Sequence, residues 1–139
     1  MFDYAGQMTS AEAMKTLTED PNAVLIDVRT MPEWNFVGVP NLSSIGKEVV
    51  TISWQEFPTM QVNGSFVEQV QSAGVAPTNK VLLLCRSGAR SHAAATALAQ
   101  AGFKDCHNVT DGFEGDKDEN GHRNTIRGWR ASGCPWFQG

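Results

Sequence analysis

The sequence predicts an α/β domain with a mostly parallel sheet, and three observations carry this prediction. Short apolar runs alternate along the chain with segments of helical composition, which is the order expected of strand–helix–strand units. Two of these runs, 23–28 and 81–84, are almost entirely apolar, as in strands buried on both faces of a parallel sheet. Glycine, proline and asparagine punctuate the chain between the segments, so each element has a defined end.

The first half of the chain predicts a helix and two strands. Thr9 and Glu12 have the spacing of a capping box, which marks the start of a helix. Several prolines and glycines interrupt 29–47, so a long loop is expected there. The expected elements are a helix from the capping box to Leu17 or Thr18, a strand at 23–28, a loop at 29–47 and a β-branched strand at 49–52.

The second half predicts further helices and strands around an apolar run that ends in a cysteine. Gly74 and Gly102 each follow a helical segment, where glycine commonly ends a helix. The expected elements are a loop at 54–63, a short helix at 65–70, a strand at 81–84, a helix from about Ser91 or His92 to Ala101, a strand at 106–109 and a closing helix at 126–132.

Composition limits the functional classes. The chain has 139 residues, 41% of them hydrophobic, which suits one domain, 1–139, with a substantial core. A formal net charge of −4 argues against nucleic-acid binding, which needs a basic surface. No apolar run is long enough to span a membrane, and the N-terminus lacks the basic and apolar regions of a signal peptide. We therefore expect a cytoplasmic protein without nucleic-acid or membrane partners.

The loop after the 81–84 strand carries the chemistry. Cys85 stands at the end of this strand, where the sites of parallel sheets gather, and the next helix directs its N-terminal dipole toward the thiol. Such a cysteine ionises readily and acts as a nucleophile, whereas a core cysteine would be inert. The residues that follow could surround an anion with hydroxyl groups, backbone N–H groups and positive charge: Arg86, Ser87, Gly88, Ala89, Arg90 and Ser91.

Three segments of the chain resemble signatures of the rhodanese family, the single-domain sulfurtransferases. Leu25–Arg29 with Glu33 and Trp34 is similar to the first signature, and Cys85–Ser91 is similar to the active-site loop. Asp111–Gly115, with the later Gly128–Trp129 and Gly133–Pro135, resembles the C-terminal signature. The resemblance implies a rhodanese-like three-layer domain in which helices flank a central, mostly parallel sheet of about five strands.

The same resemblance implies a sulfurtransferase of the thiosulfate sulfurtransferase type. Cys85 would take a sulfane sulfur from a small sulfur-containing anion such as thiosulfate, forming a persulfide, and pass it to a thiol or to cyanide. No cofactor and no metal are implied. A persulfide relay to a protein acceptor, or a rhodanese-like interaction module, is an alternative that the sequence does not separate from this activity.

A cysteine phosphatase or arsenate reductase is the nearest rival enzyme. Those sites have the pattern Cys-x5-Arg, with five residues between the cysteine and the arginine. Here four residues separate Cys85 from Arg90, and position 91 is serine. The smaller loop favours a persulfide over a tetrahedral oxyanion. Within the loop, Arg90 is the expected sulfonate ligand because it lies near the helix start, whereas Arg86 could instead face solvent.

The supporting residues and the other cysteines have expected structural roles. Asp27 and Arg29 follow a buried strand and are expected to form a hydrogen-bonded pair that braces the loops. Ser91 could donate a hydrogen bond to substrate or serve as a helix N-cap. Cys106 and Cys134 are expected to be inert, with a resolving role in redox chemistry left open.

Two departures from the rhodanese pattern stand out. Val37–Pro40 lacks the histidine that the family usually carries in this segment. Residues 116–127 are predicted to form a loop insertion within the C-terminal signature. Asp116–Gly121 matches the first half of a calcium loop, but position twelve is Arg127 instead of a glutamate, so a solvated acidic turn is expected.

Overall fold

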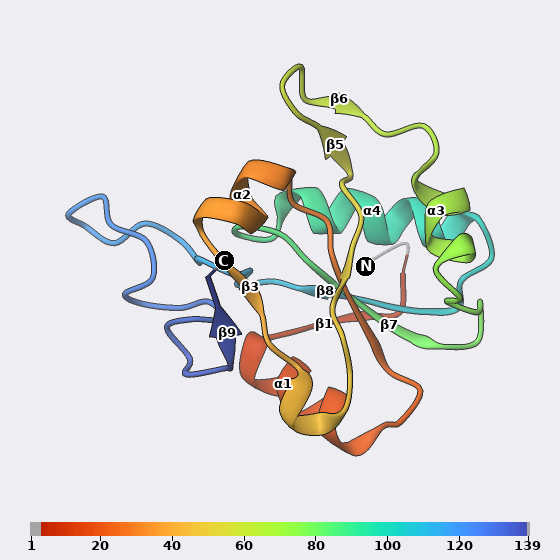
Figure 1. The fold of residues 1–139 in the computed structure, drawn as a ribbon, viewed down its shortest axis with the longest axis horizontal. Helices are drawn as coiled ribbons and strands as arrows, with labels where there is room; N and C mark the ends of the chain where they lie inside the picture. Colours follow the sequence, from red (N-terminus) through yellow and green to blue (C-terminus); the bar gives the residue numbers. More distant parts are fainter. Residues whose placement is uncertain (1–3, 139) are drawn as a thin grey trace.

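The computed structural model describes residues 4–138 and shows a five-stranded parallel sheet flanked by helices (Figure 1). The strand order is β1-β8-β7-β2-β4, and every neighbouring pair is parallel. The elements are β1 (Gly6–Met8), α1 (Ser10–Glu19), β2 (Val24–Asp27), α2 (Met31–Phe36), β3 (Val39–Pro40), η1 (Ser43–Ile45), β4 (Val50–Thr51), β5 (Gln55–Glu56), β6 (Gln61–Val62), α3 (Phe66–Ser72), β7 (Lys80–Leu84), α4 (Ala89–Gln100), β8 (Asp105–Val109) and β9 (Trp136–Phe137). This α/β architecture confirms the predicted fold class.

The sheet separates two hydrophobic cores. Successive side chains of β7 point to opposite faces, so Leu83 and Cys85 join one core and Leu82 and Leu84 join the other. The first core includes buried residues of α3 and α4, and the second includes buried residues of α1 and the C-terminal segment. The layers are therefore helix, sheet and helix, and Cys85 belongs to the α3–α4 side.

Most of the predicted elements are present with shifted ends. The Thr9–Glu12 capping box is confirmed, because each residue's side chain accepts a hydrogen bond from the backbone N–H of the other. The strands β2, β4, β7 and β8 and the helices α1, α3 and α4 were expected. Helix α4 begins at Ala89, however, two residues before the predicted start at Ser91.

Three expectations were wrong. The predicted 29–47 loop contains α2, which Thr30 and Glu33 cap and which has proline in its first turn. The predicted 54–63 loop contains the antiparallel pair β5–β6. Residues 126–132 form turns instead of a closing helix, because Gly128 has a φ of +119° and its N–H donates to the Asp111 carboxylate.

Residues 116–127 form a loop whose flanking residues, Gly115 and Gly128, lie next to each other. Their backbones are in close contact, because a Cβ built on Gly128 would be only 2.8 Å from the Gly115 nitrogen. Inside the loop, the Asp118 carboxylate accepts hydrogen bonds from the N–H groups of Asn120 and His122 and from the Thr125 hydroxyl. Within residues 4–138, no cluster of three or more histidine, cysteine, aspartate or glutamate side chains is arranged to hold a metal ion.

The sheet brings the carboxyl ends of β2 and β7 to one edge. Asp27 pairs in register with Leu84, so the residues that follow each strand emerge beside one another. Helix α4 starts four residues after Cys85 and turns its N-terminus back toward this edge (Figure 1). None of the helices in the described part of the chain is both long enough and apolar enough to cross a membrane.

Candidate active site

Cys85 occupies the first position after β7 and lies almost entirely inside the protein, with 1% of its surface exposed. Its Sγ accepts a hydrogen bond from the backbone N–H of Gly88 at 3.1 Å and lies 3.2 Å from the Ser91 Oγ. A backbone N–H aimed at sulfur stabilises a thiolate or an anionic persulfide in the way that it stabilises an oxyanion. The loop therefore has the geometry expected of a nucleophilic cysteine.

Gly88 makes this loop possible for two reasons. Its φ of +111° lies in the left-handed region, where a side chain is unfavourable. A Cβ at this position would be only 2.5 Å from the Thr110 carbonyl oxygen, so the loop also packs too closely against the chain after β8 to accept alanine. Gly88 thus aims its own N–H at the sulfur and serves as the N-cap residue of α4.

A pocket of about 320 Å³ opens onto the sulfur. Four parts of the chain contribute to it: the loop after β7, the start of helix α4, helix α2 and the β5–β6 hairpin. This volume lies at the lower end of the range found for small-molecule pockets. The lining residues are Glu33, Gln55, Met60, Cys85, Arg86, Ser87, Ala89 and Arg90.

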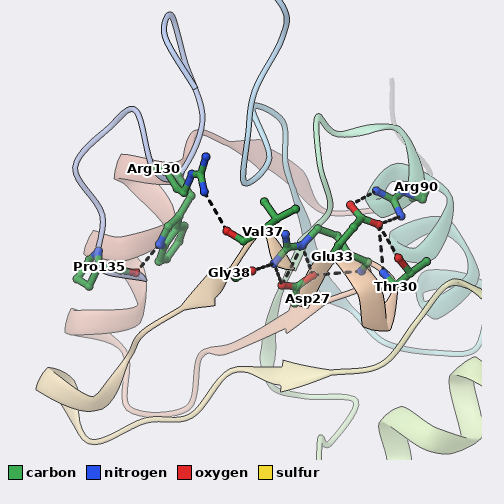
Figure 2. A network of polar contacts seen from close by, with 10 residues as sticks. Asp27, Thr30, Glu33, Val37, Gly38, Arg90, Arg130 and Pro135 are labelled. Atoms are coloured by element: carbon green, nitrogen blue, oxygen red, sulfur yellow. Dashed lines mark hydrogen bonds and ion pairs between the residues drawn. The ribbon is translucent and has the colours of Figure 1, made fainter. Parts of the chain in front are cut away.

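The guanidinium of Arg90 is bound to the carboxylate of Glu33. Two parallel hydrogen bonds of 2.7 and 2.9 Å join these groups, and the Thr30 hydroxyl donates to the same carboxylate (Figure 2). Burial alone would raise the pKa of Glu33, but the hydrogen bonds and charge of Arg90 outweigh it and hold this pKa below its usual range. Likewise burial disfavours charged Arg90, yet Glu33 raises the Arg90 pKa above its ordinary value. The ion pair is therefore preformed.

The Arg86 side chain, unlike that of Arg90, is not bonded to a carboxylate in the described part of the chain and is available to bind an anion. Its side chain is exposed, lines the pocket beside Cys85, and forms no hydrogen bond or ion pair with any residue between 4 and 138. Its backbone carbonyl, by contrast, is fixed by the N–H groups of Glu114 and Gly115. The loop thus anchors the Arg86 backbone and leaves its guanidinium available to bind an anion. Arg90, which the sequence favoured as the sulfonate ligand, is thus already bonded to Glu33, and the role of either arginine in binding substrate stays a prediction.

Ser91 is not the helix N-cap, because it stands in the third position of α4. Its side chain is fully buried and lies between the Cys85 sulfur and Asn108 on β8. Ser87 and Ala89 lie at the pocket wall, so the structure brings all the predicted loop residues around Cys85. Their roles in binding substrate stay predictions.

Asp27 and Arg29 form a fully buried pair beneath the same edge of the sheet. The Arg29 Nη2 donates to Asp27 Oδ2 and to the Gly38 carbonyl, each at 2.6 Å (Figure 2). The Arg29 Cζ also lies over the Phe113 ring, 4.2 Å from its centroid. These contacts join the ends of β2 and α2 to the C-terminal segment. Both charged groups bond to protein atoms and neither lines the pocket, as a supporting role requires.

The other two cysteines are buried away from the pocket. Burial, with a smaller effect of Asp105, raises the pKa of Cys106 to about 12, and burial together with Asp111 raises the pKa of Cys134 to about 11. Both thiols are therefore protonated at neutral pH, and neither contributes to the lining around Cys85.

Sequence reasoning missed Glu33 as a partner of the loop and Asn108 as a neighbour of Ser91. Thr30 and Glu33 have the spacing of a capping box with a proline between them, and this signal could have located α2. Nothing in the local sequence around Asn108 indicates that its side chain reaches the loop, because the contact depends on the pairing of β7 with β8.

The curated relatives of this chain include uncharacterized proteins and rhodanese-like proteins. Among curated proteins, an uncharacterized protein of Rickettsia conorii is 36% identical over 128 residues, which cover 91% of this chain and 93% of that protein. The chloroplastic Rhodanese-like domain-containing protein 4 of Arabidopsis thaliana is 28% identical over 134 residues, which cover 96% of this chain but 26% of that protein.

Two solved structures match nearly the whole of this chain. The crystal structure of Rv0390 from M. tuberculosis matches with 45% identity and a TM-score of 0.89, covering 98% of this chain and 99% of that one. The polysulfide-sulfur transferase homodimer from Wolinella succinogenes matches with 24% identity and a TM-score of 0.68, covering 99% and 80%, which shows a shared fold.

The fold and the loop around Cys85 place this chain in the rhodanese-like class. A family model described as STR4 middle domain matches residues 5–139. The chain therefore belongs to this rhodanese-like family, with a match that spans nearly all of its length.

Proposed function

We propose that this protein is a sulfurtransferase that carries a sulfane sulfur as a persulfide on Cys85. One observation supports this proposal above the others: the Cys85 sulfur accepts a hydrogen bond from the Gly88 N–H in a small pocket that Arg86 also lines. The Arg86 side chain has no partner within residues 4–138. This combination offers a nucleophile, a donor for its anionic form and a charge for an anionic substrate.

The reaction would have two displacements at sulfur. The Cys85 thiolate attacks the outer sulfur of a donor such as thiosulfate; a new S–S bond forms, and the old S–S bond breaks with its electron pair leaving on sulfite. The product is an anionic persulfide. An acceptor thiolate or cyanide then attacks the outer sulfur and regenerates the Cys85 thiolate, so no oxidant or cofactor is consumed.

The distribution of charge suits this sequence of steps. The negative donor would meet Arg86, because Arg90 is neutralised by Glu33. The persulfide would stay beside the Gly88 N–H, which bonds the sulfur without adding a fixed positive charge. The acceptor would be a small thiol, cyanide or a thiol on a protein, since each can attack the exposed outer sulfur.

Incubation with thiosulfate followed by intact-mass measurement tests the proposal. We expect the wild-type protein to gain the mass of a single sulfur atom, and Cys85→Ser to gain none. Cys106→Ser and Cys134→Ser are matched controls that remove an equally buried thiol outside the pocket, and both should still gain the sulfur. If the wild type gains no sulfur from thiosulfate or from polysulfide, the proposed function is wrong.

A further inference from the structure

A buried hydrogen-bonded chain connects Cys85 to strand β8. It runs from the Cys85 Sγ to the Ser91 Oγ at 3.2 Å and from the Ser91 Oγ to the Asn108 Oδ1 at 2.5 Å. The Asn108 Nδ2 then reaches the Gly88 carbonyl at 3.1 Å. The exposed fractions of these side chains are 1% for Cys85, 0% for Ser91 and 3% for Asn108, so their hydrogen bonds form without competition from bulk water.

The orientation of the Asn108 amide follows from its contact with Gly88. A carbonyl oxygen only accepts hydrogen bonds, so the amide atom that faces the Gly88 oxygen must be the NH₂ group. The other orientation would place two oxygens 3.1 Å apart in a buried site and leave both without a donor. The Asn108 Oδ1 therefore faces Ser91, and it can only accept.

This orientation determines where the Ser91 hydroxyl hydrogen lies. Ser91 has a single hydroxyl hydrogen, and the short contact with the Asn108 Oδ1 requires it. The Gly88 carbonyl, at 3.2 Å from the same hydroxyl, already accepts from the Asn108 amide and from the His92 N–H. Consequently the Ser91 oxygen presents a lone pair to Cys85, and the sulfur contact is made by the thiol hydrogen.

We propose that Asn108 is a positioning residue that turns the Ser91 hydroxyl away from Cys85 and so favours the protonated thiol over the thiolate. Ionisation of Cys85 would leave sulfur facing a lone pair unless Ser91 gave up its bond to Asn108. The proposal deepens the proposed sulfurtransferase function, on which its biological meaning rests: the resting cysteine is held back, and the reactivity of the nucleophile is set from a neighbouring strand.

The charged groups around the thiol are unaffected by a neutral change at Asn108. Arg86, Arg90 and Glu33 line the pocket with Cys85, and Asp27 lies at the end of the adjacent strand β2. Asn108 itself is uncharged, and the described elements packed on the sulfur, β7, β8 and α4, bring no other ionisable side chain into its hydrogen-bonded chain. If substitution of Asn108 changes the pH profile of Cys85 alkylation, the cause would therefore be a change in the orientation of the Ser91 hydroxyl.

The test is the pH dependence of iodoacetamide alkylation at Cys85 in the wild type and in Asn108→Leu, which has the same shape and no hydrogen bonds. With Asn108 removed, Ser91 can donate to the thiolate, which competes better than the neutral Gly88 carbonyl. We expect alkylation at pH 7 to become about two to ten times faster, from the strength of one hydrogen bond. The midpoint of the profile should move to lower pH by up to about one unit.

The profile separates this effect from a loosened loop. Easier access to the sulfur would raise the plateau rate at high pH and leave the midpoint in place, whereas the proposed effect moves the midpoint. In a Ser91→Ala background, which has no hydroxyl to turn, Asn108→Leu should leave the midpoint unchanged. An unmoved midpoint in the single variant, or an equal shift in the Ser91→Ala background, would overturn the proposal.

Ser91→Ala also decides the question if Asn108→Leu does not fold. We expect its midpoint to be no higher than that of the wild type, because the native hydroxyl does not donate to sulfur; a rise would show the opposite. Alkylation requires no sulfur donor. A protein that gains no sulfur from thiosulfate would thus refute the proposed function alone, and an unshifted midpoint would refute the role of Asn108 alone.

Discussion

The two arginines that line the pocket differ in their side-chain contacts, and we assign them different tasks for this reason. Arg90 makes two hydrogen bonds to Glu33, so its charge is largely neutralised before substrate arrives. Arg86 has an anchored backbone and an unpaired side chain at the pocket. An anion that binds Arg86 gains a charge-assisted interaction without first breaking another.

We predict that Arg86→Gln weakens binding of an anionic sulfur donor. The concentration of thiosulfate that gives half-maximal persulfide formation should rise about tenfold or more, from the loss of a charge-assisted hydrogen bond, with a smaller effect on the rate at saturation. Lys104→Gln removes the same charge from the opposite end of β8 and should change this concentration little. Equal effects of the two variants would contradict the role given to Arg86.

At the scale of elements, the Glu33–Arg90 pair fastens α2 to α4. The carboxylate leaves α2, which is only six residues long, and holds an arginine in the first turn of α4. The side chains are 19% and 17% exposed, so the pair is screened less than a surface ion pair. Helix α2 thereby forms one wall of the pocket and fixes the start of the helix behind Cys85.

We predict that Glu33→Gln makes the protein less stable at neutral pH but not in acid. The folded-state pKa of Glu33 is lowered, so its contribution is present above the unfolded value of about 4.3 and is lost as the pH falls through the folded value. Urea unfolding should show a loss of about 1–2 kcal/mol at pH 7 that shrinks below about pH 4. Glu119→Gln, in the exposed turn, is the control, and an equal loss at both pH values would rule out the ion pair as the cause.

A second feature at the scale of elements is the close backbone contact at the base of the 116–127 loop. Gly115 has a φ of +74°, and a Cβ there would lie 1.9 Å from the Arg127 carbonyl oxygen. Gly121, at the loop tip, has a similar φ of +76° but open space around it. The two positions therefore share the backbone conformation and differ in packing.

We predict that Gly115→Ala destabilises the protein far more than Gly121→Ala. At Gly121, the unfavourable positive φ of alanine alone should lower the free energy of unfolding by about 1 kcal/mol. At Gly115 the added steric clash should bring this loss to about 3 kcal/mol or more. Thermal unfolding of both variants measures the difference. Similar melting temperatures would mean that the base of the loop relaxes without cost.

At the scale of the whole molecule, the parallel sheet gathers residues that are distant in sequence. The order β1-β8-β7-β2-β4 places β7 between β2 and β8, so the loop after β7 is flanked by Asp27 on one side and Asn108 on the other. Helix α2 and the β5–β6 hairpin contribute further residues to the lining of the pocket. Each of these neighbours comes from a different region of the chain.

The sequence predicted the central part of this arrangement well and its edges poorly. Strands β2 and β7 were found because their apolar runs need burial on both faces, and α1 because its capping box is local. Strands β1 and β9 were missed because they are short and are stabilised by pairing with β8 and β3 rather than by their own composition. The prediction of a closing helix at 126–132 was wrong because tertiary contacts impose a positive φ on Gly128.

The sequence by itself determined the α/β class and the position of Cys85 at the end of an apolar strand, because strand burial and capping are local properties of the chain. Only the tertiary structure decided that Glu33 neutralises Arg90, that Arg86 remains available and that Asn108 reaches Ser91. Those contacts join residues up to 57 positions apart, and the sheet pairing that brings them together has no signature in any single segment.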